Sequence, residues 1–176
     1  MSNVWRHSDH ANLVLPSSAD RVTVGSDELT FRATSDATAG ALVAIDVRMT
    51  PGGGPPLLHR HDAVEIYKVE RGELAIYLED DAGEVARVVA GTGSVVAIPG
   101  GREHTIRNES QSPARAYVVF APGREMERFA RAADELTTQG TAEPADVLVL
   151  AERHGVEMTR PVPIGARERF APRRSP

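Results

Sequence analysis

Three kinds of residue are scarce or missing in this chain of 176 residues: it has no cysteine, a single lysine (Lys68) and only 5% aromatic residues. Without cysteine the chain can form no disulfide framework, no thiolate metal ligand and no cysteine nucleophile. The low aromatic content leaves few side chains on which a large planar ligand could stack. The lack of disulfides is compatible with a cytoplasmic protein, and we expect that location.

Long hydrophobic runs are also missing, and the charge balance is mildly acidic. No apolar stretch approaches the ~18 residues of a bilayer-spanning helix, and the N-terminus lacks the basic start and apolar core of a signal peptide. The net charge of −5 disfavours nucleic acid as the main partner. We therefore expect one globular domain with no membrane or nucleic-acid partner, and the hydrophobic content of 41% suffices for its core.

Short β-like runs separated by glycine, proline and acidic turns fill the first two thirds of the sequence. In the run 42–49, Val43, Ile45 and Val47 share one face while Asp46 and Arg48 take the other, as in a half-buried strand. The candidate strands are 21–24, 29–33, 42–49, 63–70, 73–78, 84–89, 94–98, 105–107 and 114–120. This succession of short strands predicts an all-β sandwich or barrel.

The hydrophobic period changes after Pro122. Over residues 124–136 apolar side chains recur every three or four positions, which predicts an amphipathic helix; they are Met126, Phe129, Ala130, Ala133 and Leu136. A second helix is predicted from Pro144 to a point before Gly155, with Val147, Leu148 and Ala151 as its buried stripe. We divide the chain into an N-terminal arm (1–20), a β-barrel (21–122) and a helical extension with an irregular tail (123–176), the tail starting at Thr159.

Three histidines and a glutamate stand at metal-ligand spacing. His59, His61 and Glu65 occupy odd positions, so a single extended segment would direct all three side chains to one side. His104, on a second strand, would complete the set. Neutral imidazoles and a carboxylate suit iron, manganese, cobalt, nickel, copper or zinc better than magnesium or calcium.

Two longer patterns surround these residues. The first, G(X)5HXH(X)3–4E(X)6G, is filled by Gly53, His59, His61, Glu65 and Gly72; the second, G(X)5PXG(X)2H(X)3N, is filled by Gly93, Pro99, Gly101, His104 and Asn108. With these positions, the segment from about residue 41 to 120 resembles the cupin superfamily, and in particular its small single-domain members similar to quercetinases. The resemblance implies an all-β double-stranded β-helix, the jelly-roll barrel of cupins, here with two short C-terminal helices.

The resemblance also implies a metal centre. His59, His61, Glu65 and His104 would bind one divalent transition metal ion (Fe, Ni, Mn, Cu, Co or Zn), and Glu65 would act as general base as well as ligand. The partner would be a small-molecule substrate or ligand, and the chain would form a homodimer in which the arm before Arg21 is exchanged between subunits. The alternative is that the histidines are buried core residues, hydrogen-bonded without a metal.

Several neighbouring residues receive more ordinary expectations. We expect Glu103, Arg60 and Lys68 on the face opposite the metal ligands, so that Glu103 is no fifth ligand. Tyr67 shares the parity of Glu65 and could line the cavity or pack in the core, and Asn108 is expected to hydrogen-bond a turn. His7, His10 and His154 lie outside both motifs and are expected to be solvated.

Three functional hypotheses follow. The first is a metal-dependent dioxygenase, an oxidoreductase acting on an enol, a diketone or a flavonol-like molecule chelated to the ion. The second is a non-oxidative metalloenzyme, such as an isomerase, cyclase or lyase, in which the ion acts as a Lewis acid. The third is a small-molecule-binding cupin without turnover. One barrel hosts many chemistries, so the fold does not choose among them.

Overall fold

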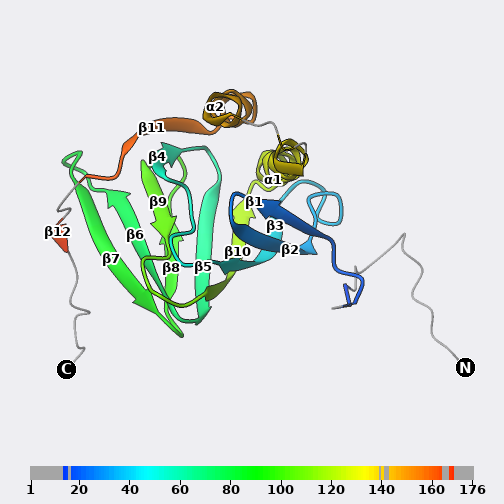
Figure 1. The fold of residues 1–176 in the computed structure, drawn as a ribbon, viewed down its shortest axis with the longest axis horizontal. Coiled ribbons are helices and arrows are strands. Elements are labelled where there is room, and N and C mark those ends of the chain that lie inside the picture. Colours follow the sequence, from blue (N-terminus) through cyan, green and yellow to red (C-terminus); the bar gives the residue numbers. More distant parts are fainter. Residues whose placement is uncertain (1–13, 16, 139, 141–142, 164–166, 169–176) are drawn as a thin grey trace, which may run out of the picture.

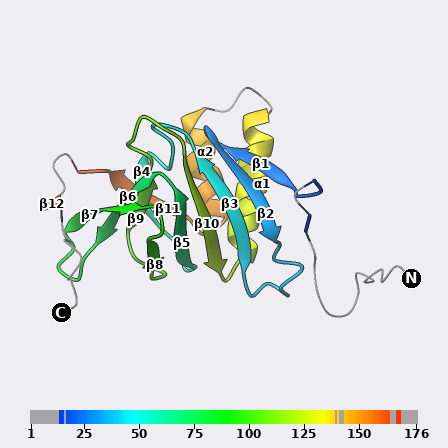
Figure 2. The same cartoon turned by 90° about the horizontal axis from the view of Figure 1, so that it is seen from below.

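Two six-stranded sheets face each other in the computed structural model, which describes residues 14–15, 17–138, 140, 143–163 and 167–168 (Figures 1 and 2). The first sheet has the order β1 (Arg21–Val24), β2 (Asp27–Ala33), β3 (Val43–Met49), β10 (Ala114–Ala121), β5 (Val64–Arg71) and β8 (Val95–Ile98). The second has the order β11 (Glu157–Pro161), β4 (Leu57–Arg60), β9 (His104–Arg107), β6 (Glu73–Glu79), β7 (Val85–Gly91) and β12 (Arg167–Glu168).

Alternating side chains supply the core between the sheets. On β5, Glu65, Tyr67 and Val69 are buried, whereas Val64, Ile66 and Lys68 are exposed. Leu74 and Ile76 of β6 are buried in the same core cluster as Tyr67 and Val69. The two inner faces therefore pack against each other, as in other sandwiches, and the predicted all-β architecture is confirmed.

Three strands were not predicted: β4, β11 and the two-residue β12, which pairs with β7. β4 is only four residues long and follows a glycine- and proline-rich stretch, which hides it in the sequence. β11 lies where the irregular tail was expected to begin, so that prediction is wrong for Thr159–Pro161: β11 pairs with β4, and Thr159 Oγ1 donates to the carbonyl of Leu58 at 2.9 Å. The proline at position 161 ends β11 and does not prevent pairing, because prolines are tolerated on edge strands.

The two predicted C-terminal helices are present as α1 (Arg124–Thr138) and α2 (Pro144–Arg153), which lie side by side at one side of the sandwich (Figure 1). α1 packs against β1 and buries Met126, Ala130 and Ala133. A 2.7 Å hydrogen bond from the backbone N–H of Thr23 on β1 to the carboxylate of Asp134 on α1 joins the two elements. Neither α1 nor α2, nor any other helix in the described ranges, has the length and hydropathy needed to cross a membrane.

The buried stripe predicted for α2 is wrong in two of its three positions. Ala151 is fully buried, but Val147 and Leu148 are 39% and 45% exposed. α2 turns a different face to α1 and β11 than its hydrophobic pattern indicates, because five consecutive apolar residues, 147–151, leave the inward direction undefined. His154, at the end of α2, is also less solvated than expected, since it pairs with Glu125 at 3.2 Å.

The outer face of the second sheet carries a small separate core. Leu58, Ala75 and Tyr77 are buried there, and Val162, just beyond β11, packs against them. β11 is further tied to the sheet by two ion pairs, Arg60–Glu157 at 2.8 Å and Arg160–Glu103 at 2.6 Å. Of the predicted N-terminal arm, residues 1–13 and 16 lie outside the described part of the chain.

Candidate metal centre

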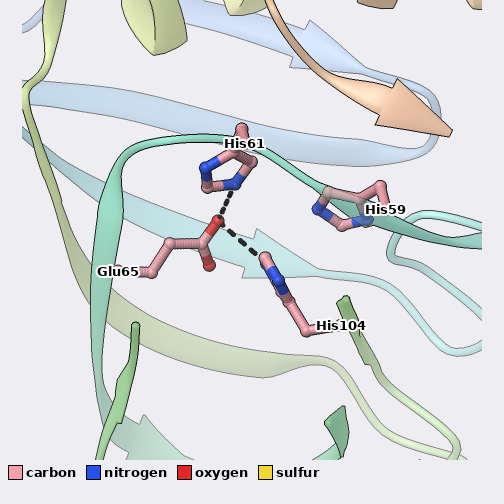
Figure 3. Close-up of side chains that lie close together, drawn as sticks. All are labelled: His59, His61, Glu65 and His104. Carbon is pink, nitrogen blue, oxygen red and sulfur yellow. Dashed lines mark hydrogen bonds and ion pairs between the residues drawn. The ribbon is translucent and has the colours of Figure 1, made fainter. Parts of the chain in front are cut away.

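The four predicted ligands come together between the sheets (Figure 3). His59 lies on β4 and His104 on β9, and the two residues are directly opposite each other in the second sheet. Glu65 lies on β5 in the first sheet, and His61 lies in the short connection between β4 and β5. The prediction that these four residues would converge is therefore met by the geometry.

The route by which they converge differs from the prediction. We expected His59, His61 and Glu65 on a single extended segment, but the chain leaves the second sheet after Arg60 and enters the first sheet at Val64. The crossing is compact because Gly101 N–H donates to the carbonyl of His61 at 2.8 Å. The three side chains therefore meet although no single strand carries them.

The cluster is tight and almost completely shielded from solvent. One nitrogen or oxygen atom from each of the four residues lies within 4.8 Å of the others. His59 and His61 are each 6% exposed, Glu65 2% and His104 1%. Oε1 of Glu65 is 2.7 Å from Nε2 of His61 and 3.3 Å from Nε2 of His104. A single carboxylate oxygen thus holds two imidazoles.

This environment sets the ionisation of the cluster. Burial, followed by the charge of His104, lowers the pKa of His59 to about 4, so this imidazole is neutral at pH 7. Burial alone would raise the pKa of Glu65, but its hydrogen bonds with His104 and His61 outweigh burial and lower the pKa to about 2. Burial opposes charge on His104 as well, yet the bond to Glu65 prevails and raises its pKa.

Backbone carbonyls behind two of the three imidazole rings orient those rings. Nδ1 of His104 donates to the carbonyl of Arg102 at 2.8 Å, and Nδ1 of His59 lies 3.5 Å from the carbonyl of Leu57. Both rings therefore present Nε2 to the cluster, the arrangement usual for metal-binding histidines. His61 Nδ1 and Glu65 Oε2 are buried without a hydrogen-bond partner. Such unsatisfied polar atoms are rare in protein interiors and fit a site that a cation would complete.

The neighbouring residues largely follow expectation. Arg60 and Lys68 are exposed on the opposite face. Glu103 is outside the cluster, although its side chain is buried against Arg160 and not solvated. Asn108 holds a turn: its amide donates to the carbonyls of Met49 and Ser112, and its oxygen accepts from Ser110 N–H. Tyr67 is buried in the core next to the Glu65 carboxylate, and burial, followed by the charge and close approach of Glu65, raises the pKa of Tyr67 well above its usual value.

Sequence reasoning missed two residues beside the cluster. Phe120 lies opposite Glu65 on β10, and its ring centroid is 6.4 Å from that of His61. Met158 lies opposite His59 on β11. Alternation along β10, in which Ala114, Ala116 and Val118 point inward, could have identified Phe120. No sequence signal indicated Met158, because β11 itself was not predicted.

Residues 45–120 match the family model described as a cupin domain. Curated proteins give no match. Among solved structures, a mutant of Bacillus subtilis oxalate decarboxylase OxdC aligns with a TM-score of 0.53 at 20% identity, covering 67% of this chain and 32% of that one. The chain thus spans about a third of the length of that decarboxylase.

Two other solved structures are closer in size. An RmlC-like cupin from Shewanella frigidimarina aligns with a TM-score of 0.54 at 15% identity, covering 66% of this chain and 96% of that one. The polyketide cyclase RemF from Streptomyces resistomycificus aligns with a TM-score of 0.52 at 19% identity, covering 65% and 82%. At these identities the likeness establishes the fold. Together with the match over residues 45–120, it shows that this chain has the cupin fold and contains a cupin domain.

Proposed function

We propose that the protein is a metal-dependent cupin dioxygenase that binds one divalent transition metal ion through His59, His61, Glu65 and His104. The observation that carries the proposal is the convergence of three imidazoles and one carboxylate, all buried, within 4.8 Å. The substrate would be a small molecule that chelates the ion through enol or diketone oxygens. The four ligand atoms already lie close together, so metal binding requires no rearrangement of the backbone.

The donor set fits such an ion. His59 is already neutral and Glu65 already ionised near pH 7, so neither has to lose a proton before binding. Three neutral imidazoles and one carboxylate leave a divalent ion with a net charge of about +1, which favours anionic oxygen ligands. Four protein ligands also leave room in the coordination shell for a substrate.

Glu65 is the proposed catalytic residue. Its Oε1 is occupied by His61 and His104, whereas its Oε2 is buried without a partner. Once the imidazole nitrogens and one oxygen of Glu65 bind the ion, the second oxygen of Glu65 would be left to accept a proton from an enol O–H or from the carbon between two carbonyls. The apolar core around the site would exclude water, so that the carbanion is not protonated by solvent before it reacts.

The bound ion would supply Lewis acidity and, if redox-active, a centre for reaction with O2. In a dioxygenation both oxygen atoms enter the products, so the reaction requires no external reductant. The chain's own contribution is to hold the substrate carbanion in a dry site, to keep the proton on Glu65 and to orient the imidazoles through the carbonyls of Arg102 and Leu57.

A non-oxidative reaction is the second candidate, favoured by the similarity of the fold to the polyketide cyclase RemF. An isomerase, cyclase or lyase would use the same Lewis-acid site and the same proton acceptor, but would consume no O2. The buried carboxylate serves both reactions, so oxygen dependence is what separates them.

Elemental analysis of protein purified without a histidine tag or chelator is the first test. We expect close to one equivalent of iron, nickel, manganese or copper, and oxygen uptake with acetylacetone or another enolisable diketone as substrate. Turnover that continues unchanged under anaerobic conditions would replace the dioxygenase by the non-oxidative enzyme. Diketone that binds but is recovered unaltered would leave a binding protein, and failure to take up any metal would remove all the metalloenzyme candidates.

A further inference from the structure

The metal-ligand cluster lies at one end of the sandwich. Glu65 is aligned across the first sheet with Val43, Phe120 and Ile98, and each of these residues is among the first two or last two of its strand. His59 and His104 are aligned across the second sheet with Met158 and Leu78, which also lie at strand ends. These aligned residues form two facing rows, one on each sheet, that enclose the cluster.

Within the two rows, the side chains that are most exposed to solvent beside the ligands are apolar. Phe120 in the first sheet and Met158 in the second are half-buried, and both pack against the main hydrophobic core. Phe120 stands beside His61, with an angle of 60° between the ring planes, and Met158 stands beside His59. A molecule that reaches the cluster from this end of the sandwich would contact an aromatic ring on one sheet and a thioether on the other.

Cationic side chains near the site point elsewhere. Arg60 pairs with Glu157, Arg160 with Glu103, and Arg102 with Asp81. The two rows contain no arginine or lysine among the residues that the structure describes. A dicarboxylate would place its second negative charge in this apolar end without a cation to balance it, which is costly.

We infer that the site selects a ligand with a chelating oxygen head and an apolar aryl or alkyl body, and that Phe120 and Met158 contact this body. The inference rests on the proposed function, since the head is held by the metal-loaded site. Met158 belongs to β11, outside the matched cupin domain of residues 45–120, so the C-terminal segment contributes part of the specificity.

The test is equilibrium binding to zinc-loaded protein, because zinc is redox-inert and binding can be read without turnover. Acetylacetone, 1-phenylbutane-1,3-dione and oxalate are titrated by calorimetry. We expect the phenyl diketone to bind on the order of tenfold more tightly than acetylacetone, from the additional apolar area buried, and oxalate to bind most weakly. Met158→Gln keeps the length of the side chain but makes it polar, and should lower the phenyl preference roughly threefold.

Two control variants distinguish loss of a contact with the ligand from general destabilisation of the protein. Met158→Leu retains an apolar side chain and should retain the phenyl preference. Leu29→Ala truncates another partly buried side chain of the same core on β2, away from the cluster, and should also leave it unchanged. Equal binding of the two diketones, tighter binding of oxalate, or no binding of either diketone overturns the inference. Phenyl preference in the zinc-loaded protein upholds the inference whatever the reaction is. If the iron-, nickel-, manganese- or copper-loaded protein then takes up no oxygen with the same diketones, the dioxygenase alone is rejected.

Discussion

His59 and His104 lie directly opposite each other on β4 and β9, with their ring centroids 4.5 Å apart. Two neighbouring strands thus present their imidazoles side by side, while Glu65 approaches from the other sheet. Protonating both imidazoles at this distance would place two positive charges together, which is unfavourable. After burial, the charge of His104 is the next cause of the low pKa of His59. The arrangement favours a single cation that both imidazoles share.

Replacing His61 by alanine should abolish stoichiometric metal binding. His61 supplies one of the four ligand atoms, and its loss also removes a hydrogen bond from Glu65. Added metal stabilises a binding-competent protein by about 2.7 kcal/mol at one hundred times the dissociation constant, and this gain should vanish in the variant. Thermal unfolding with and without metal measures it. His154→Ala, which changes a histidine outside the cluster, should keep full metal binding; a His61→Ala protein with full occupancy would contradict the proposed ligand set.

Metal affinity should rise with pH around neutrality. The pKa of His104 is raised in the metal-free protein, so a proton must leave this ring before the ion binds, whereas His59 is already neutral above pH of about 4. The apparent affinity should therefore fall as pH decreases through the raised pKa of His104, by up to about tenfold per pH unit below it. Calorimetry in buffers with different heats of ionisation should detect the released proton. An affinity that is constant from pH 6 to pH 8 would contradict this protonation.

Asn108→Ala should destabilise the fold without removing the metal ligands. The buried amide satisfies the carbonyls of Met49 and Ser112 and accepts from Ser110, so its loss strands several backbone groups. We expect a decrease in the free energy of unfolding of about 2–3 kcal/mol in urea denaturation. Ser110→Ala, in the same turn, should cost less than about 1 kcal/mol. A neutral Asn108→Ala variant would show that the turn is held by other contacts.

Glu127→Gln should weaken the attachment of α1 and flatten the acid side of the stability profile. Glu127 accepts from Ser35 N–H at 2.6 Å and pairs with Arg131 at 2.8 Å. Burial would raise the pKa of Glu127, but these bonds outweigh it and lower the pKa. A lowered pKa means that the unfolded chain binds more protons, so this stabilisation is complete above the unfolded pKa near 4.5 and is lost as pH falls through the folded one.

Unfolding experiments from pH 7 to pH 3 test this prediction. At pH 7 the variant should be less stable by about 1–2 kcal/mol, and the difference from the original protein should shrink toward pH 3. Glu135→Gln, on the exposed side of the same helix, is the matched control. A difference that does not depend on pH would mean that Glu127 acts through packing and not through its charge.

Much of the barrel could be predicted from the sequence because its strands alternate in polarity. β3, β5 and β10 were found within one or two residues of their observed bounds, since their inner and outer faces differ in polarity. β4 and β11 escaped notice because they are short and lie next to prolines. Their strand structure depends on pairing between distant segments, β4 with β9 and β11 with β4. The direction that α2 faces was also lost, because it depends on contacts with α1 and β11.

The candidate ligands were predictable for a different reason. Motif spacing identified His59, His61, Glu65 and His104 although the predicted path between them was wrong. Spacing does not reveal the contacts that tune these residues: the carbonyl of Arg102 behind His104, the partnerless Oε2 of Glu65, and the neighbours Phe120 and Met158. These depend on which strands become adjacent, and that is decided by the complete sandwich.

The crossing of the chain between β4 and β5 has a mechanical consequence. Because Glu65 belongs to one sheet and His59 and His104 to the other, the distance between carboxylate and imidazoles depends on the spacing of the two sheets, which the core side chains between them set. Replacing Ile45 or Ile106 by a larger or smaller side chain would change the distances between the four ligand atoms without contacting them. For a metal ion held by these four residues, preference for one ionic radius over another would therefore depend on packing throughout the core.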